Sequence, residues 1–172
     1  EYAKGGRFNY TYGGDINGDG SNLNDLLYIP TSSEIGEMQF SEPGQGAAFD
    51  AYIAQDDYLN GRRGQYAERY GAISPWRGRL DLKILQEYNI KINENRTNTL
   101  QLSIDVLNVG NMINSDWGVV QQPNNVQPIG VTVDPSTSTP TYSFNPDLKQ
   151  TFGYDTSLAS RWQAQFGLRY IF

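Results

Sequence analysis

The 172-residue chain contains no cysteine and no histidine. These absences exclude thiol chemistry, disulfide cross-links, imidazole-based acid–base catalysis and the usual zinc sites. Basic residues are also scarce, because 13 Lys and Arg stand against 19 Asp and Glu and give a formal net charge of −6. Nucleic acid is therefore not an expected partner, since phosphate binding requires clustered positive charge. We also find no nucleophile–base constellation and no phosphate-binding glycine loop, and we expect no enzymatic activity.

Long apolar runs are missing as well. No stretch approaches the roughly 20 apolar residues of a membrane helix, and no signal peptide opens the chain. The first residues resemble the interior of a longer protein, so we expect a signal sequence and further domains upstream. Against this polar background, with a mean hydropathy of −0.58, the chain carries 12 Tyr, 7 Phe and 3 Trp. β-Structure with aromatic faces is one way to place so many rings on a polar chain.

The main structural signal is a period-two alternation of apolar and polar residues, which is typical of β-strands. At the C-terminus it predicts a strand over 159–172. The even positions of this strand are apolar or aromatic: Trp162, Ala164, Phe166, Leu168, Tyr170 and Phe172. Helical spacing would mix apolar and polar residues on every face.

Two further segments alternate in the same way and form a predicted hairpin. The apolar residues occupy the even positions over both 79–92 and 98–110, and a polar turn at 93–97 connects them. A register slip of one residue would turn one apolar row to the opposite face. We therefore expect paired residue numbers to have an even sum, near 188 or 190.

A fourth strand is predicted over 6–13, where Phe8, Tyr10 and Tyr12 alternate with polar residues. Two long stretches, 14–78 and 111–158, are rich in Gly, Asn, Pro, Ser, Thr and Asp. Loops of this length are unusual in a compact domain. A helix over 50–59 is the one helix that the pattern favours. The sequence thus predicts an all-β fold with four long antiparallel strands and two long loops.

The strand lengths favour a transmembrane β-barrel. A strand that crosses an outer membrane needs about 9–11 residues, with lipid-facing apolar side chains alternating with lumen-facing polar ones. With Phe172 in the periplasm, both long loops fall outside the cell and the turn at 93–97 falls in the periplasm, as barrels require. Four strands cannot close a barrel, whose smallest members have about 8 strands, so the remaining strands must come from elsewhere. The alternative is a soluble extracellular β-sandwich, a calcium-stabilised binding or adhesin module.

The barrel interpretation assigns residues to two faces. The predicted lipid-facing aromatic residues are Phe8, Tyr10, Tyr12, Tyr88, Trp162, Phe166, Tyr170 and Phe172. The predicted lumen-facing charged residues are Asp81, Lys83, Glu87, Lys91, Asp105, Arg161 and Arg169. A lipid-facing row should have no protein across it, whereas a sandwich should bury Trp162, Phe166 and Tyr170 under a second sheet.

The first long loop contains a calcium-like motif. Oxygen-bearing residues recur at alternate positions of an EF-hand-like half-loop, in which Gly20 permits the sharp turn. The predicted metal ligands are Asp15, Asn17, Asp19, Ser21 and Asp25. The motif departs from an EF-hand at its twelfth position, which is Leu26 where a Glu is expected, so Asp25 would have to substitute. An Asx-rich turn without metal explains the same residues.

Other charged and aromatic residues of the first loop give weaker signals. The acidic pair Asp56 and Asp57 is expected to be solvated, as is the basic pair Arg62 and Arg63. Loop tyrosines such as Tyr66 offer a stacking surface for a glycan or peptide, but they also pack on their own loop.

Several of these segments resemble one known family. The run from Tyr10 to Gly20, followed by Asn24-Asp25-Leu26 and Tyr28-Ile29-Pro30, is similar to the late region of TonB-dependent receptors of the Oar-like type from Bacteroidetes. Residues 103–111 resemble the penultimate-strand segment of such receptors. The terminal Arg169-Tyr170-Ile171-Phe172 resembles the aromatic signal that the barrel-assembly machinery reads. The resemblance covers residues 8–172.

The resemblance implies a C-terminal segment of a 22-stranded outer-membrane barrel that is plugged by an N-terminal domain. It implies TonB-driven movement of a large ligand, with TonB contacted through a part that this chain lacks. The implied partners are the remainder of the barrel, its plug and outer-membrane lipid. A surface lipoprotein and an extracellular ligand are further candidate partners.

Overall fold

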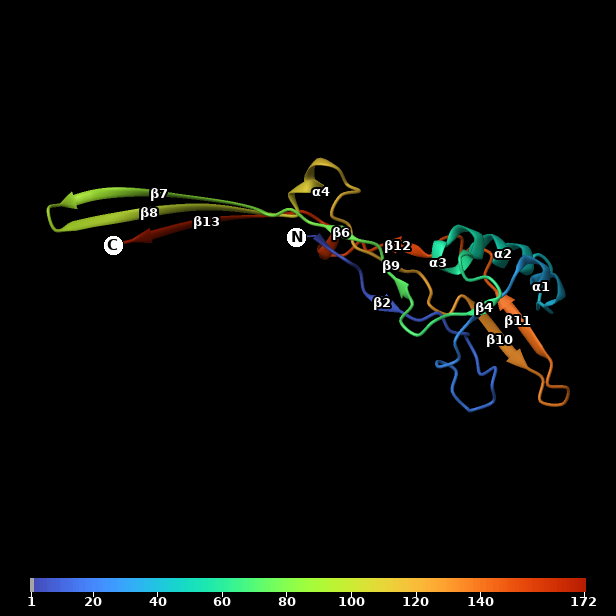
Figure 1. Ribbon diagram of the computed structural model, residues 1–172. Coiled ribbons are helices and arrows are strands. Elements are labelled where there is room, and N and C mark those ends of the chain that lie inside the picture. The colour runs from blue at the N-terminus through green and yellow to red at the C-terminus, as the bar shows by residue number, and fades with distance from the viewer. Residues whose placement is uncertain (1) are drawn as a thin grey trace. The chain divides into compact units, whose positions relative to one another are not determined.

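The computed structural model describes residues 2–172 (Figure 1). The chain divides into two compact units, which we describe separately. The sheet unit comprises residues 2–4, 76–121 and 154–172, and the loop unit comprises residues 5–75 and 122–153. Strands greatly outnumber helices, so the predicted β-rich class is confirmed.

The strands of the described residues are mostly short. They are β1 (Tyr2–Ala3), β2 (Arg7–Phe8), β3 (Tyr28–Ile29), β4 (Gln65–Tyr66), β5 (Ala72–Ile73), β6 (Arg77–Gly78), β7 (Leu82–Asn93), β8 (Arg96–Leu107), β9 (Gln121–Pro123), β10 (Ile129–Val133), β11 (Pro140–Phe144), β12 (Phe152–Tyr154) and β13 (Gln163–Ile171). The helices are α1 (Ser32–Glu37), α2 (Gln45–Gln55), α3 (Asp57–Asn60), α4 (Val109–Ile113) and the 3₁₀ turn η1 (Leu158–Ser160).

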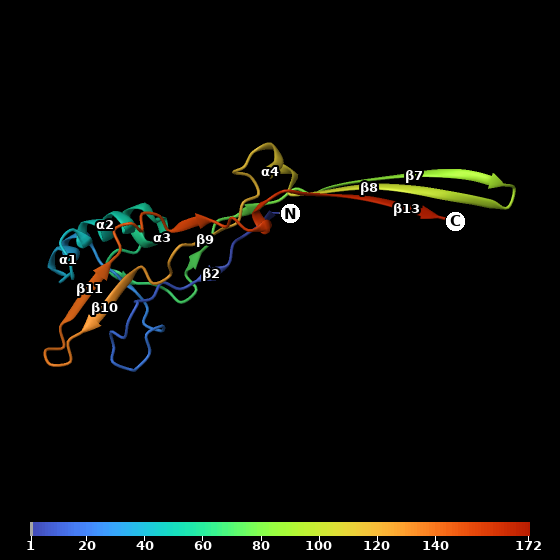
Figure 2. The same ribbon diagram turned by 180° about the vertical axis from the view of Figure 1, so that it is seen from behind.

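The sheet unit is built on three long strands. β7, β8 and β13 have 12, 12 and 9 residues and form an antiparallel sheet in the order β13-β8-β7. They run side by side in both views (Figures 1 and 2). Leu82 pairs with Val106 and Tyr88 with Leu100, so paired numbers sum to 188, one of the two even sums expected. Phe166 pairs with Ile104 in the other ladder, and the even residues of all three strands therefore share one face.

This even face of the sheet is largely apolar and exposed. Its paired rows are Ile84–Ile104–Phe166, Gln86–Leu102–Leu168 and Tyr88–Leu100–Tyr170. The side chains of Phe166 and Leu168 are 76% and 71% exposed. Within residues 2–172, no second sheet covers Phe166 or the rings of Trp162 and Tyr170, which stay about half exposed.

The odd face of the same sheet is mostly polar, and several of its polar side chains pair across the strands. Lys83 forms an ion pair of 3.0 Å with its cross-strand partner Asp105. Gln101 donates a hydrogen bond of 2.7 Å to Glu87, and Arg169 lies opposite Gln101 on the third strand. Paired charges and amides across neighbouring strands stabilise a sheet by a few tenths of a kcal/mol each, roughly 0.2–1 kcal/mol. Two faces of opposite chemistry thus follow directly from the register.

A short irregular segment ends β8 in the sheet unit. Asn108 adopts a left-handed backbone conformation, with φ of 54°, which stops the strand. Its N–H donates to the Asp81 carboxylate at 2.8 Å, and its side-chain amide donates to the Gly118 carbonyl at 3.1 Å. Arg79 also pairs with Asp81 at 2.8 Å. Asp81 therefore stabilises the end of the hairpin and lies just before β7. Arg161 also lies outside a strand, at the C-cap of η1. That these two charges line a lumen stays a prediction.

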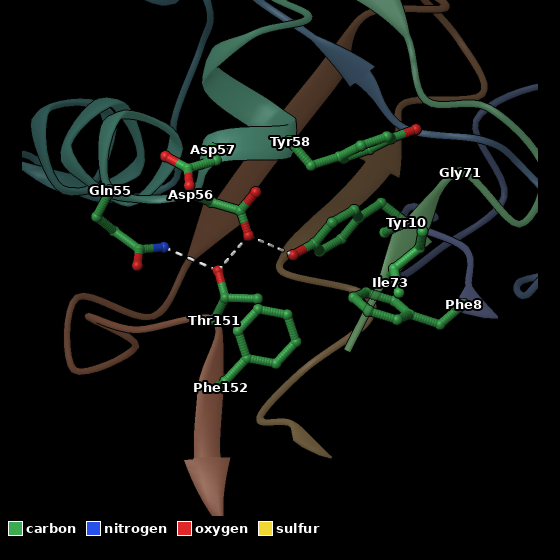
Figure 3. A pocket seen from close by; sticks show the side chains of 11 residues that line it. Phe8, Tyr10, Gln55, Asp56, Asp57, Tyr58, Gly71, Ile73, Thr151 and Phe152 are labelled. Carbon is green, nitrogen blue, oxygen red and sulfur yellow. Dashed lines mark hydrogen bonds between the residues drawn. The ribbon is translucent and has the colours of Figure 1, made fainter. Parts of the chain in front are cut away.

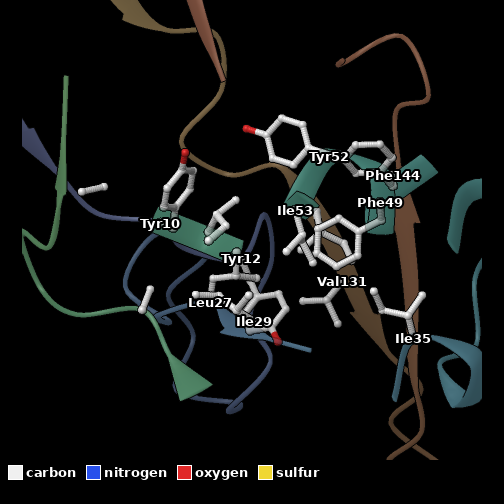
Figure 4. Packing of buried hydrophobic residues seen from close by; sticks show 14 residues of the cluster. Tyr10, Tyr12, Leu27, Ile29, Ile35, Phe49, Tyr52, Ile53, Val131 and Phe144 are labelled. Atoms are coloured by element: carbon white, nitrogen blue, oxygen red, sulfur yellow. The ribbon is translucent and has the colours of Figure 1, made fainter. Parts of the chain in front are cut away.

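The loop unit joins the two predicted loops around one core (Figure 4). The β10–β11 hairpin of the second loop contacts the first loop through its backbone. Val131 N–H donates to the Gly13 carbonyl at 3.2 Å, and Tyr142 N–H donates to the Gln39 carbonyl at 2.8 Å. The long stretches are therefore not free loops, because both supply buried residues to a common core, most of them from the first stretch.

The core of the loop unit is aromatic and aliphatic. Its fully buried side chains include Tyr10, Leu27, Phe49, Tyr52 and Ile129, each 1% exposed or less. Phe144 packs against Phe49 with ring centroids 5.3 Å apart. Burying a Leu, Ile or Phe side chain contributes about 1.5–3 kcal/mol to stability. Such a core explains why a polar chain carries so many rings.

One prediction about the first loop is corrected, and one helix was missed. The helix predicted over 50–59 is instead α2 followed by α3, because Asp56 leaves the helical conformation (φ −100°, ψ 116°) and caps α3 by accepting the Leu59 N–H at 2.9 Å. Helix α1 was not predicted, although Thr31 and Glu34 form a capping box at its start. The Thr31 N–H and the Tyr28 hydroxyl lower the pKa of Glu34 by donating to its carboxylate.

The fourth long strand, predicted over 6–13, is wrong. Only Arg7 and Phe8 form a strand there, and they pair with Ile73 and Ala72, so paired numbers sum to 80. β7 begins beyond that ladder, at Leu82, and the described chain has three long strands rather than four. Tyr10 and Tyr12 are 1% and 5% exposed in the core of the loop unit, so they do not face lipid. Period-two alternation marks any half-buried extended segment, whatever covers it.

Candidate functional site

A pocket in the loop unit is the most developed site (Figure 3). It has a volume of about 410 Å³. Four aromatic side chains, two carboxylates and several smaller groups line it: Phe8, Tyr10, Gln55, Asp56, Asp57, Tyr58, Gly71, Ala72, Ile73, Thr151 and Phe152. The residues come from the predicted strand 6–13 and from both predicted loops, which the core brings together.

Hydrogen-bond donors converge on Asp56 at this pocket. Tyr10 donates to Asp56 Oδ2 at 2.9 Å, and Thr151 donates to the same oxygen at 2.5 Å. Gln55 donates to Thr151 Oγ1 at 2.9 Å, which orients the Thr151 hydroxyl proton toward the carboxylate. The other oxygen accepts the Leu59 N–H. Asp56 is 6% exposed, and its two carboxyl oxygens accept three hydrogen bonds.

Two tyrosine hydroxyls near Asp56 are held in the neutral form. Burial raises the pKa of Tyr10 far above its usual range, and the neighbouring Tyr52 and the Asp56 charge raise it further. Burial also raises the pKa of Tyr52. The Tyr52 hydroxyl is buried without a hydrogen-bond partner among the described residues. A neutral phenol is the form that can donate to a carboxylate.

The aromatic wall of the pocket is a continuous row of rings. Phe8 contacts Phe152 and Tyr10 edge-on, with ring centroids 6.1 and 5.2 Å apart. Tyr10 stacks on Tyr58 at 6.0 Å. The Tyr58 hydroxyl accepts the Glu68 N–H at 2.8 Å, which fixes the end of the row.

Sequence reasoning misjudged Asp56 and the basic pair. Asp56 is buried rather than solvated, and the one sequence signal was its position three residues before Leu59, which suits an N-cap. Arg63 is tied to the Asp50 carboxylate at 2.7 Å. Arg62 lies over the Tyr58 ring, 5.2 Å from its centroid, and pairs with Glu68 at 2.6 Å. The expected exposure of Asp57 agrees with the structure. Tyr66 is exposed and also packs edge-on against Tyr28 of its own loop, with ring centroids 5.2 Å apart.

The calcium-like motif folds into a compact turn. Asp15 accepts the N–H groups of Gly18 and Gly20 at 2.6 and 2.7 Å, and Asp19 accepts the Ser21 N–H at 2.8 Å. Asn24 and the Ser21 N–H lower the pKa of Asp19 by donating to its carboxylate.

Asp25, at the eleventh position of the motif, contacts residues near the start of the motif. Asp25 accepts the Ile16 N–H at 3.0 Å and the Asn17 side-chain amide at 2.5 Å. Asp25, and not Leu26, therefore closes the loop. No group of three or more Asp or Glu side chains in residues 2–172 is arranged to hold a metal ion.

The remaining predicted site residues lie on the sheet. Tyr88, Phe166 and Tyr170 are on the exposed even face, whereas Trp162 and Phe172 flank the ends of β13. Lys83, Glu87, Lys91, Asp105 and Arg169 are on the odd face.

Comparison with known proteins identified no matching family model, no similar curated protein and no similar solved structure. Among the described residues, no helix is both long enough and apolar enough to cross a membrane.

Proposed function

We propose that β7, β8 and β13 form part of the wall of an outer-membrane transport receptor, in a β-barrel completed by other strands. The observation that carries the proposal is the exposed even face, which is largely apolar across three paired strands while the odd face is mostly polar. Barrels in outer membranes have this division between lipid-facing and lumen-facing residues. The family resemblance adds the expectation of TonB-dependent uptake or export of a large ligand.

The dimensions of β13 fit an outer membrane. Phe172 follows Trp162 by ten positions, so about 33 Å of strand separates the two aromatic ends at about 3.3 Å per residue. A strand tilt of about 40° reduces this to about 25 Å along the membrane normal, the height of the apolar band of such barrels. At one end, Tyr88 and Tyr170 flank Leu100 in a single row, and Tyr170 also hydrogen-bonds to Asn98. Tyrosines of this kind are typical of a membrane–water interface.

The edges of the sheet support a larger assembly. Within residues 2–172, β7 and β13 each pair along one side only, with β8. Long exposed edge strands with an apolar face favour pairing with other strands, and folded proteins normally protect such edges. Closure into a barrel satisfies both edges at once, and the missing strands would supply the partners.

In this proposal the loop unit is extracellular and presents the pocket to the medium. Calcium binding by Asp15, Asn17, Asp19, Ser21 and Asp25 remains part of the proposal, because a weak extracellular site tolerates an incomplete ligand set. The ion would bind the turn at the start of the loop unit.

Single cysteines test the barrel, since the chain contributes no native thiol. Cysteine is placed in turn at each position from 163 to 168 of the whole protein and carries a nitroxide label. Accessibility is then measured to oxygen, which dissolves in lipid, and to a water-soluble nickel chelate.

We expect oxygen accessibility to peak at 164, 166 and 168, and nickel accessibility to peak at 163, 165 and 167. A soluble sandwich would protect the even positions from both reagents. Equal access of nickel to both faces would show that water covers the whole sheet, and either result would refute the barrel.

A further inference from the structure

The pocket of the loop unit combines an aromatic lining with negative charge. Its lining includes four rings and two carboxylates, but no Lys or Arg. Its volume of about 410 Å³ lies in the range of small-molecule sites, about 300–1,000 Å³. The rings supply apolar contact area, and the carboxylates give the site a negative potential.

The charge of Asp56 has no cation beside it. Its three donors, from Tyr10, Thr151 and Leu59, are neutral groups. No ion pair in residues 2–172 includes Asp56. Buried charges are normally paired or bound to an ion, because a lone charge loses its hydration. Asp56 is thus a negative centre that a ligand can neutralise.

The two arginines that follow α3 are committed to other partners. Arg62 pairs with Glu68, and Arg63 pairs with Asp50 and donates to the Pro30 carbonyl at 3.3 Å. The position of Arg62 is informative in another way, because its guanidinium lies over Tyr58, one of the rings that line the pocket. The aromatic row therefore already attracts one cation within the protein.

We propose that this pocket binds an organic cation, an ammonium or guanidinium group carried on an apolar body. The faces of aromatic rings attract cations, and carboxylates behind them increase that attraction. A calcium ion fits less well, because it needs six to eight oxygen ligands and this lining is mostly apolar. The proposal concerns the loop unit alone and holds whether or not the sheet crosses a membrane.

Four probes of known charge test the proposal on the whole protein in a non-ionic detergent. Choline and benzyltrimethylammonium are cations, 3,3-dimethylbutan-1-ol has the shape of choline without its charge, and methyl glucoside represents a neutral saccharide. Binding is measured by saturation-transfer NMR and by titration calorimetry. We expect both cations to bind, the larger one more tightly, and their affinity to fall as salt is added.

Two isosteric variants locate the site. Asp57→Asn removes a charge from the exposed part of the lining, and Glu42→Gln removes one from an exposed position outside the lining. We expect Asp57→Asn to weaken cation binding about fivefold, the scale of one exposed charge pair, and Glu42→Gln to leave it unchanged. Phe152→Leu should also weaken binding, because it removes a ring and keeps an apolar side chain.

Three results would overturn the proposal: equal binding of choline and its neutral analogue, equal effects of the two charge variants, or binding of methyl glucoside in place of both cations. Absence of binding by all four probes would also overturn it. Circular dichroism and proteolysis of the variants check that each is folded, so that a loss of binding is not a loss of structure.

Discussion

Replacing Phe166 by arginine tests whether the even face of the sheet contacts lipid. Phe166 is 76% exposed and shares a row with Ile104 and Ile84. It follows Trp162 by four positions and precedes Phe172 by six. At about 3.3 Å per residue and a tilt of about 40°, it lies about 10 Å and 15 Å from the two aromatic borders, near the middle of the apolar band.

An arginine at this depth strongly destabilises a membrane barrel. Its cost in outer-membrane barrels is about 2–4 kcal/mol near the midplane and falls toward the interfaces. The matched control is Gln165→Arg, one position away on the odd face and opposite the Asp105 carboxylate. That arginine meets water and a negative charge, so we expect a change of no more than about 0.5 kcal/mol.

The assay is urea unfolding of the whole protein in lipid vesicles of two thicknesses. We expect Phe166→Arg to lower the free energy of unfolding by about 2–4 kcal/mol, and by less in the thinner bilayer, where the side chain reaches the interface. A face open to water would lose almost nothing. A penalty that is the same for Gln165→Arg, or that does not depend on bilayer thickness, would refute lipid contact.

Three further predictions concern the loop unit. Asp15→Ala should make the first loop more sensitive to protease, and a chelator should do the same to the wild type; unchanged cleavage with and without chelator would count against calcium. Thr151→Val should lower the stability of the loop unit by about 1–3 kcal/mol, because it removes a donor to buried Asp56, whereas Thr151→Ser should not, as measured by the urea dependence of proteolysis. The raised pKa values of Tyr10 and Tyr52 mean that the folded state retains their protons more tightly. Their contribution is therefore complete below pH about 10 and is lost as the pH rises above it; a loop unit whose proteolysis is constant from pH 9 to 11 would contradict this.

The sheet could be predicted in detail because its information is local. Period-two alternation fixes the face of every residue, and the requirement that apolar rows coincide fixes the parity of the register. The even sum expected for paired residues follows from these two rules, and Leu82 pairs with Val106 accordingly. The polar turn between the two strands was predicted from its composition alone.

The alternation rule failed at residues 8–12, because contact with lipid and burial in a protein core give the same period-two pattern. Phe8, Tyr10 and Tyr12 alternate as a membrane strand would, but a protein core covers Tyr10 and Tyr12. Alternation reports that one side of an extended segment is shielded from water, not what shields it. To tell whether lipid or protein shields a residue, its contact partners must be known. Tyr10 contacts Asp56, which lies more than 40 positions further along the chain.

The sequence by itself determined the β-rich class, the three long strands and the division of their faces, because each depends on neighbours two positions apart. Only the tertiary structure decided that the two long stretches share one core and that Asp56 is buried beneath an aromatic row. Thr151 reaches Asp56 across 95 positions of chain. No local pattern encodes such a contact, since it depends on how hydrophobic burial brings distant segments together.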